Sequence, residues 1–396
     1  MIPQETGLWS RPFILCWIAN FFQGIGFNLF LHFPGFLTEL GASSVVIGWL
    51  SATMALTAIA VRPAIGQIMD SRGRRGLILF GSVLNVAVTA LYLSVDHVGL
   101  WVYLIRGLHG VAEAILFTVL FTYAADHVPR SRLTEGLALF GVSGMLPMSI
   151  GGLLGDWVLA LHGYPALFQA ALACNGLALL FALGLYDSAP SPMAEMSSPR
   201  VGFLGVARQT NLLPIWWLTT IFFIGLAAIF VFLKTYVMSR GVGSVGGFFS
   251  AYAAVAIALR LGLGWVPDRF GAVRILVPSV LALAGGMLAL ALAESNRDVL
   301  VAGALCGLGH GYTFPILSGL VVTRVGEVDR GSALALFTGI ADLGAVMGSP
   351  LFGWVAEEWS YTGLYALAAA GLAVGVAVFL PWDQADRGSS SPSPDS

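Results

Sequence analysis

Three ionisable side chains fall on one face of a segment that is otherwise apolar. The segment reads RGLHGVAE and places Arg106, His109 and Glu113 at spacings of three and four residues. Residues at these spacings lie on the same side of an α-helix, and a rise of 1.5 Å per residue puts roughly 10 Å between Arg106 and Glu113 along its axis. A carboxylate with a histidine as a bridge can take up and release protons. The alternative is an Arg106–Glu113 ion pair that only orders the helices.

The composition of the whole chain indicates that this face lies in a membrane. The 396 residues are 57% hydrophobic and 10% charged, and their mean hydropathy is +0.85, whereas roughly a quarter of the residues of a soluble domain are charged. Ionisable groups are costly in lipid, so those found there are functional candidates. The net charge of −2 gives no indication of a nucleic-acid partner. The three cysteines lie in apolar runs without metal or disulfide spacing, and we expect neither a metal nor a cofactor.

Twelve segments are apolar over the length of about 20 residues that a spanning helix needs. They are predicted at 12–36, 45–65, 76–95, 99–121, 134–157, 164–186, 212–236, 245–266, 273–293, 299–323, 332–356 and 361–381. The sequence therefore predicts an all-α integral membrane protein with an N-terminal half (1–186) and a C-terminal half (211–381). A Pro- and Ser-rich cytoplasmic linker (187–210) joins them, and residues 382–396 form a disordered cytoplasmic tail.

Basic residues are distributed unevenly between the two sides of the predicted membrane. With the N-terminus inside, thirteen arginines fall in inner loops and ends, against two, Arg240 and Arg297, in outer loops. This is a positive-inside bias. We therefore expect both termini to lie in the cytoplasm. We expect the protein to reside in a bacterial inner membrane or a plasma membrane.

Two loops at corresponding places indicate that the halves are repeats. The first reads GQIMDSRGRR from Gly66, and the second reads GWVPDRFGAVR from Gly264. A shift of 198 residues pairs Arg62 with Arg260, Gly66 with Gly264, Asp70 with Asp268 and Gly73 with Gly271. The word LALF also recurs, at 137–140 and at 334–337, with a shift of 197. Halves of six spans each insert with the same orientation, as parallel repeats do in some transporters.

The first loop resembles the signature of the major facilitator superfamily, G-x-x-x-D-R-x-G-R-R, with Ser71 at the position of its first arginine. The resemblance implies twelve transmembrane helices in two pseudo-symmetric halves that rock about a central cavity. We interpret the loops as latches in which Gly66 allows close packing and Gly73 a positive φ; the alternative is a loop that only sets topology. The gating residues are then Arg62, Gly66, Asp70, Arg72, Gly73, Arg74, Arg75, Arg260, Gly264, Asp268, Arg269 and Gly271.

Spans one, four, seven and ten line the cavity in this family, so their polar residues are candidates for binding substrate or protons. Besides the three residues of span four, they are Asn20, Gln23, Asn28 and His32 of span one and His310 of span ten. Such groups also join helices to one another. Asp342 of span eleven can carry protons or pair with Arg62.

Two further segments resemble proton-coupled exporters of the family. R-x-x-H-G in span four is similar to their R-x-x-Q-G, and GVSGMLPMSIGG in span five contains the elements of G-x-x-x-G-P-x-x-G-G with the proline displaced by two positions. We expect a monomeric secondary transporter that exports a small organic molecule by alternating access in exchange for protons. The alternatives are a proton-coupled uptake symporter and a non-transporting sensor. An enzyme is disfavoured because HExxH and GxSxG do not occur, and ATP drive because GxxxxGK[ST] does not.

Overall fold

A computed structural model describes residues 9–129, 132–186, 202–325 and 329–389. Within these ranges the regular structure is helical, and no strand occurs. The N-terminal half holds α1 (Arg11–Leu29), α2 (Phe33–Glu39), α3 (Ser44–Arg72), α4 (Arg75–Leu91), α5 (Leu100–Asp126) and α6 (Leu133–Leu183). The rest of the chain holds α7 (Gly202–Ala207), α8 (Leu213–Arg240), α9 (Val245–Gly262), α10 (Val266–Phe270), α11 (Ala272–Ala291), α12 (Asn296–Arg324), α13 (Arg330–Glu358) and α14 (Tyr361–Ser389).

Three of the long helices, α3, α9 and α12, begin at serine residues whose side chains cap them. Ser43 and Ser244 accept hydrogen bonds from backbone amides in the first turns of α3 and α9, and Ser295 forms a capping box with Asp298 at the start of α12. Such caps satisfy amides that the first turn leaves without partners. They help to fix where these three helices start.

Eleven helical segments of the described residues are long and apolar enough to cross a membrane. One of them, Glu135–Leu183, has 49 residues, which is long enough for two crossings at 1.5 Å per residue. Gly163 interrupts its helical geometry with φ 75°, and the predicted spans 134–157 and 164–186 lie on either side of this glycine. The predicted fold class is confirmed.

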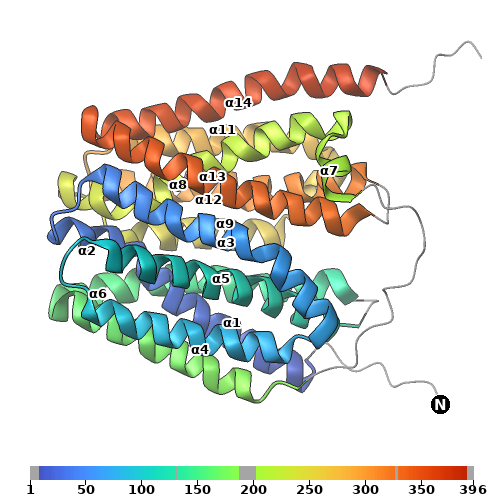
Figure 1. Cartoon of the computed structure of the whole chain (residues 1–396). Coiled ribbons are helices and arrows are strands. Elements are labelled where there is room, and N and C mark those ends of the chain that lie inside the picture. Colours follow the sequence, from blue (N-terminus) through green and yellow to red (C-terminus); the bar gives the residue numbers. More distant parts are fainter. Residues whose placement is uncertain (1–8, 130–131, 187–201, 326–328, 390–396) are drawn as a thin grey trace, which may run out of the picture.

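The helices form two bundles that lie side by side (Figure 1). The blue-to-green helices α1, α4 and α6 occupy the lower part of the view, and α11, α13 and α14 occupy the upper part. The long helices run nearly parallel, so each helix end lies at one of two ends of the molecule. We call the end at which α1 begins and α3 ends the predicted cytoplasmic end, and the end at which α3 begins the predicted external end.

The two bundles meet through two equivalent pairs of helices, α3 with α13 and α6 with α9. Near the predicted external end, a Cβ on Gly48 would collide with the backbone of Ser349, and one on Gly246 would collide with the backbone of Leu153. Glycine therefore permits a backbone-to-backbone approach in both pairs. A shift of 198 residues places Gly48 on Gly246, so the repeat of the sequence is also present in these contacts.

Three expectations from the sequence were wrong. The helix α14 continues to Ser389 instead of giving way to a disordered tail at 382, because Asp383 accepts a hydrogen bond from Arg324 Nη2 at 2.5 Å. Part of the predicted linker is helical, as α7. Gly66 does not provide the predicted close packing, because a Cβ on this residue would meet nothing within 4 Å. The remaining linker residues, 187–201, and the tail residues 390–396 lie outside the described residues.

Candidate functional site

Glu113 of α5 lies at the centre of a polar cluster inside the N-terminal half. Its Oε2 accepts a hydrogen bond of 2.6 Å from Gln23 Nε2 of α1, and its Oε1 accepts one of 3.1 Å from Asn85 Nδ2 of α4. The Glu113 side chain is 12% exposed, and both amide side chains are buried. The carboxylate therefore joins three helices through neutral donors.

His109 and Tyr92 extend this cluster along α5. The His109 Nε2 atom lies 3.6 Å from Glu113 Oε1, and it is buried without a hydrogen-bond partner. Its other ring nitrogen, Nδ1, lies 3.1 Å from the Tyr92 hydroxyl. Within the described residues, Arg106 is not within ion-pair distance of Glu113; its guanidinium carbon lies 4.9 Å from the ring centroid of Phe33. Of the three predicted residues, His109 and Glu113 therefore lie close together, whereas Arg106 lies against Phe33.

A close approach of α3 to α5 supports this face. Gly110 lies between His109 and Glu113, and a Cβ at this position would collide with the carbonyl oxygen of Met54 and the hydroxyl of Thr57 on α3. The same hydroxyl donates a 2.9 Å hydrogen bond to the carbonyl of Gly107. Glycine at 110 thus allows α3 to pack directly against the helix that carries the site.

The other polar residues of predicted span one have structural partners in this structure. Asn20 Nδ2 donates to the hydroxyl of Ser143 on α6 at 2.8 Å, and Asn28 Nδ2 donates to the backbone carbonyl of Gly24 at 2.8 Å. His32 is fully buried and lies 3.0 Å from Asp156 of α6. Of the four predicted residues of span one, the structure brings only Gln23 to Glu113.

Asp156 also connects the two bundles near the predicted external end. Its Oδ2 accepts a 2.6 Å hydrogen bond from the backbone amide of Gly246, in the first turn of α9. A carboxylate is favourable at the N-terminus of a helix because unpaired amides point toward it. Close by, the Ser149 and Ser250 hydroxyls lie 2.8 Å apart and also join α6 to α9.

Arg62 and Asp342 form an ion pair across the two bundles. Arg62 Nε lies 2.5 Å from Asp342 Oδ2, and Arg62 Nη1 donates to the hydroxyl of Thr118 at 3.2 Å. Both charged side chains are about one-fifth exposed, at 21% and 19%. The arginine of α3 is thus tied to α13 and to α5 at once. His310, by contrast, hydrogen-bonds to Tyr252 of α9 and lies outside the Glu113 cluster.

The first gating loop makes contacts within its own half. Gly73 adopts φ 81° after the end of α3, as predicted. Arg74 pairs with Asp126 at the end of α5, and Arg75 Nε donates to the carbonyl of Leu185 at 2.6 Å. The side chains of Asp70 and Arg72 lie outside the described residues.

The second gating loop has a turn of the same kind. Gly271 adopts φ 98°, and the guanidinium carbon of Arg269 lies 5.6 Å from the ring centroid of Trp265. Gly264 follows α9, where a Cβ would lie 2.7 Å from the carbonyl oxygen of Arg260. Asp268 lies in the short helix α10 and is exposed.

Asn85, Tyr92 and Asp156 were not predicted as site residues from the sequence. An aspartate inside a predicted span carries the same signal that singled out Asp342, and this signal would have found Asp156. Asn85 and Tyr92 are polar residues of the predicted span 76–95, and their importance depends on their partners on α5. Among the described residues, no group of three or more His, Cys, Asp or Glu side chains is placed to hold a metal ion.

Long apolar helices in two repeated bundles, with ionisable groups held between the helices, define a multi-pass membrane transporter. Comparison with known proteins agrees: residues 16–296 and 242–395 match the Major Facilitator Superfamily. The chain belongs to this superfamily. Its members are transporters, so the enzyme alternative no longer applies.

Similar proteins include uncharacterized transporters of the same type and solved transporter structures. One from Burkholderia pseudomallei (strain 1106a) is 27% identical over 354 residues, which cover 87% of this chain and 85% of the relative. One from Methanocaldococcus jannaschii is 22% identical and covers 94% of this chain and 99% of the relative. The nucleoside transporter NupG superposes with a TM-score of 0.73 at 13% identity (95% of this chain, 99% of NupG). The POT family transporter PepTSo superposes with a TM-score of 0.77 at 11% identity (96% of this chain, 99% of PepTSo). At such low identities the similarity shows a shared fold only.

Proposed function

We propose that this transporter exports a small organic molecule in exchange for protons, and that Glu113 carries the proton. The observation that supports this is the kind of partner that Glu113 has. Asp342 and Asp383 lie against arginines, whereas Glu113 accepts hydrogen bonds from two neutral amides. A carboxylate without a cationic partner inside a membrane protein changes its charge when it gains a proton, with no ion pair to break.

Protonation of Glu113 would change contacts between helices. As a carboxylate, it accepts from Gln23 and Asn85; as an acid, one of its oxygens becomes a donor, which an amide NH₂ group cannot accept. His109 Nε2 can accept it, because this atom is buried without a partner and lies 3.6 Å from Oε1. Protonation would therefore weaken a contact of α5 with α1 or α4 and strengthen the one with His109. Such an exchange links the charge of the site to helix positions.

We infer that the structure represents an inward-facing state. The backbone-to-backbone contacts between the bundles at Gly48 and at Gly246 lie near the predicted external end. The 70 Å³ cavity between α6 and α9 lies toward the predicted cytoplasmic end. We further propose that the protein works as a monomer in a bacterial inner membrane with both termini in the cytoplasm, as the arginine distribution predicts.

The test separates transport from proton coupling. A thermal-shift screen with purified protein selects a solute, and sealed liposomes with reconstituted protein then report its movement. We expect E113Q to lose uptake driven by an imposed pH gradient, because glutamine cannot carry a proton, and to retain exchange of labelled for unlabelled solute, which needs no net proton movement. E294Q, which changes an exposed carboxylate of a connecting loop, should behave as the wild type. Full gradient-driven transport by E113Q would exclude Glu113 as the proton carrier.

Direction is tested in cells, with the same solute. An exporter leaves cells with more solute once an uncoupler collapses the proton gradient, whereas a proton-coupled symporter leaves them with less. A sensor moves no solute in the liposome assay. Each outcome assigns the chain to one of the three alternatives.

A further inference from the structure

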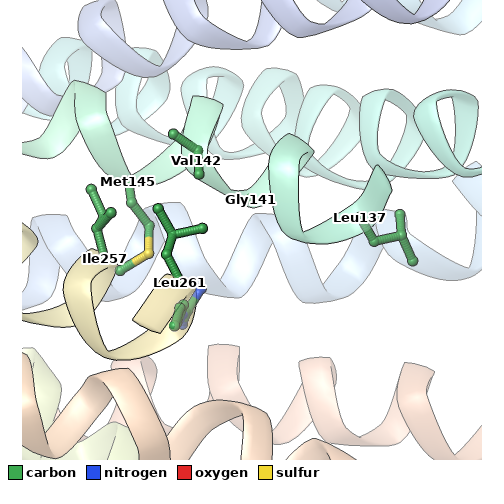
Figure 2. A pocket seen from close by; sticks show the side chains of 7 residues that line it. Leu137, Gly141, Val142, Met145, Ile257 and Leu261 are labelled. Atoms are coloured by element: carbon green, nitrogen blue, oxygen red, sulfur yellow. The ribbon is translucent and has the colours of Figure 1, made fainter. Parts of the chain in front are cut away.

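A small cavity between the two bundles has an arginine in its wall. It has a volume of about 70 Å³ and lies between α6 and α9, and the residues that line it are Leu137, Gly141, Val142, Met145, Ile257, Arg260 and Leu261. Figure 2 shows Val142 and Met145 on α6 close to Ile257 and Leu261 on α9. The cavity therefore joins an apolar wall from both halves with a single positive charge.

Arg260 has no anionic partner among the residues that the structure describes. Its Nε atom is buried without a hydrogen-bond partner, and no described carboxylate lies within 4.0 Å of its guanidinium. Tyr252 and His310 interact with Arg260 electrostatically, but both are polar groups without a carboxylate, and they hydrogen-bond to each other. Arg260 is half-buried, and a cation that is partly buried in a membrane protein without an anionic partner is costly, so this charge requires an explanation.

The internal repeat shows what is missing. Arg260 corresponds to Arg62 at a shift of 198, and Arg62 pairs with Asp342 of α13. The helix pair α9 and α6 corresponds to the pair α3 and α13, and the shift of 197 that aligns LALF places Asp342 on Met145. Met145 is buried and lines the same cavity as Arg260. Where one half has a carboxylate against its arginine, the other has a methionine beside a cavity.

We propose that this cavity binds the anionic group of an amphipathic organic solute, which supplies the carboxylate that the chain lacks at position 145. Arginine binds a carboxylate through two parallel hydrogen bonds, and the four aliphatic side chains of Leu137, Val142, Ile257 and Leu261 suit an apolar tail. At roughly 10–15 Å³ of such volume for each water-sized group, the cavity admits a carboxylate and a short tail. This site would define the substrate class of the transporter. The inference rests on the proposed transport of small organic molecules, but it depends neither on the proton-carrying role of Glu113 nor on the direction of transport.

An anion at this position would connect the two halves. Arg260 belongs to α9, whereas Leu137 and Val142 belong to α6, so the solute would bridge the bundles as Asp342 does on the other side. Loss of the solute would leave only apolar contacts there. Binding is therefore expected to bias the relative position of the halves.

The experiment measures binding of butanoate, and of its uncharged analogue butanamide, by saturation-transfer NMR. The protein is the full chain in nanodiscs of phosphatidylcholine. We expect butanoate to bind at least about tenfold more tightly than butanamide, and R260Q to lose this difference, because a hydrogen bond to a charged group contributes about tenfold or more. R260K should retain part of the preference. R297Q, which removes an exposed arginine of the opposite end, should bind as the wild type does.

A second pair of variants tests the explanation from the repeat. M145D places a carboxylate against Arg260, as in the Arg62–Asp342 pair, and should weaken butanoate binding at least about fivefold more than the isosteric M145N does. Size-exclusion chromatography verifies that each variant is folded. Equal binding of butanoate and butanamide by the wild type, or an unchanged preference in R260Q, would overturn the proposal.

Nanodiscs that contain phosphatidylglycerol distinguish a solute from a lipid headgroup. Unchanged butanoate affinity in these discs supports a soluble carboxylate as the occupant, whereas loss of affinity assigns the site to the anionic lipid and overturns the solute proposal. Binding needs no proton gradient. A failed E113Q test would therefore leave this result intact, and a failed binding test would leave the E113Q result intact.

Discussion

At the scale of residues, the acidic side chains of the membrane helices differ in what lies against them. Asp342 meets Arg62, and Asp383 meets Arg324, which makes each pair a fixed link between helices. Glu113 meets amides and a histidine instead. Pairing with a cation suits a structural or gating role, and pairing with neutral donors suits a group that exchanges protons.

The Arg62–Asp342 pair should contribute to stability as a unit. R62Q and D342N each leave a partly buried charge alone, so we expect each to lower the free energy of unfolding by about 2 kcal/mol. The double variant should lose clearly less than the sum, because it removes both charges. Thermal unfolding of the purified variants in one detergent measures this coupling. Strictly additive losses would mean that the two side chains do not stabilise each other.

The candidate site could be predicted only in part from the sequence, because some of its contacts are local to one helix and others join different helices. Spacing along one helix predicted the face of Arg106, His109 and Glu113, because that relation is local. The donors from Asn85 and Gln23 come from other helices, and a single sequence does not state which spans are neighbours. The position of Arg106 over Phe33 depends on the packing of α5 against the start of α2 in the same way.

At the scale of elements, hydropathy predicted the membrane crossings because length and apolar content decide whether a helix spans a bilayer. It predicted the break at Gly163 through the gap between two spans. The exceptions are short polar segments, such as α7 and the end of α14. There, a tertiary contact such as that of Arg324 with Asp383 stabilises helix in a sequence that reads as linker or tail.

The contact of α3 with α13 should depend on Gly48. G48A adds a methyl group that collides with the backbone of Ser349, so we expect the predicted external end to loosen, at a cost of about 1–3 kcal/mol. A cysteine in place of Ser44, near this contact, should then react several-fold faster with a membrane-impermeant maleimide. G285A is the matched control, because a Cβ there meets nothing within 4 Å. Equal labelling rates in G48A and G285A would contradict the assigned role of Gly48.

At the scale of the whole molecule, the two halves are repeats with different chemistry. Their glycine contacts correspond to each other, as Gly48 and Gly246 show. The Glu113 cluster, however, lies in one half, whereas the cavity beside Arg260, which has no anionic partner among the described residues, has its arginine in the other. The repeat could be found from the sequence because both gating loops retain their motif. The lack of a carboxylate partner for Arg260 could not be found from the sequence, because Met145 is informative only once α6 is known to face α9.

Alternating access is the claim on which the rest depends, and paired spin labels measure it most directly. One pair, at Leu100 and Trp359, joins the halves at the predicted external end, and the other, at Arg132 and Phe270, joins them at the predicted cytoplasmic end; all four residues are exposed. Distances between labels are compared at low and high pH, with and without bound solute. The account predicts opposite changes, with the external distance growing as the cytoplasmic distance shrinks. Two distances that stay constant, or that grow and shrink together, would contradict it.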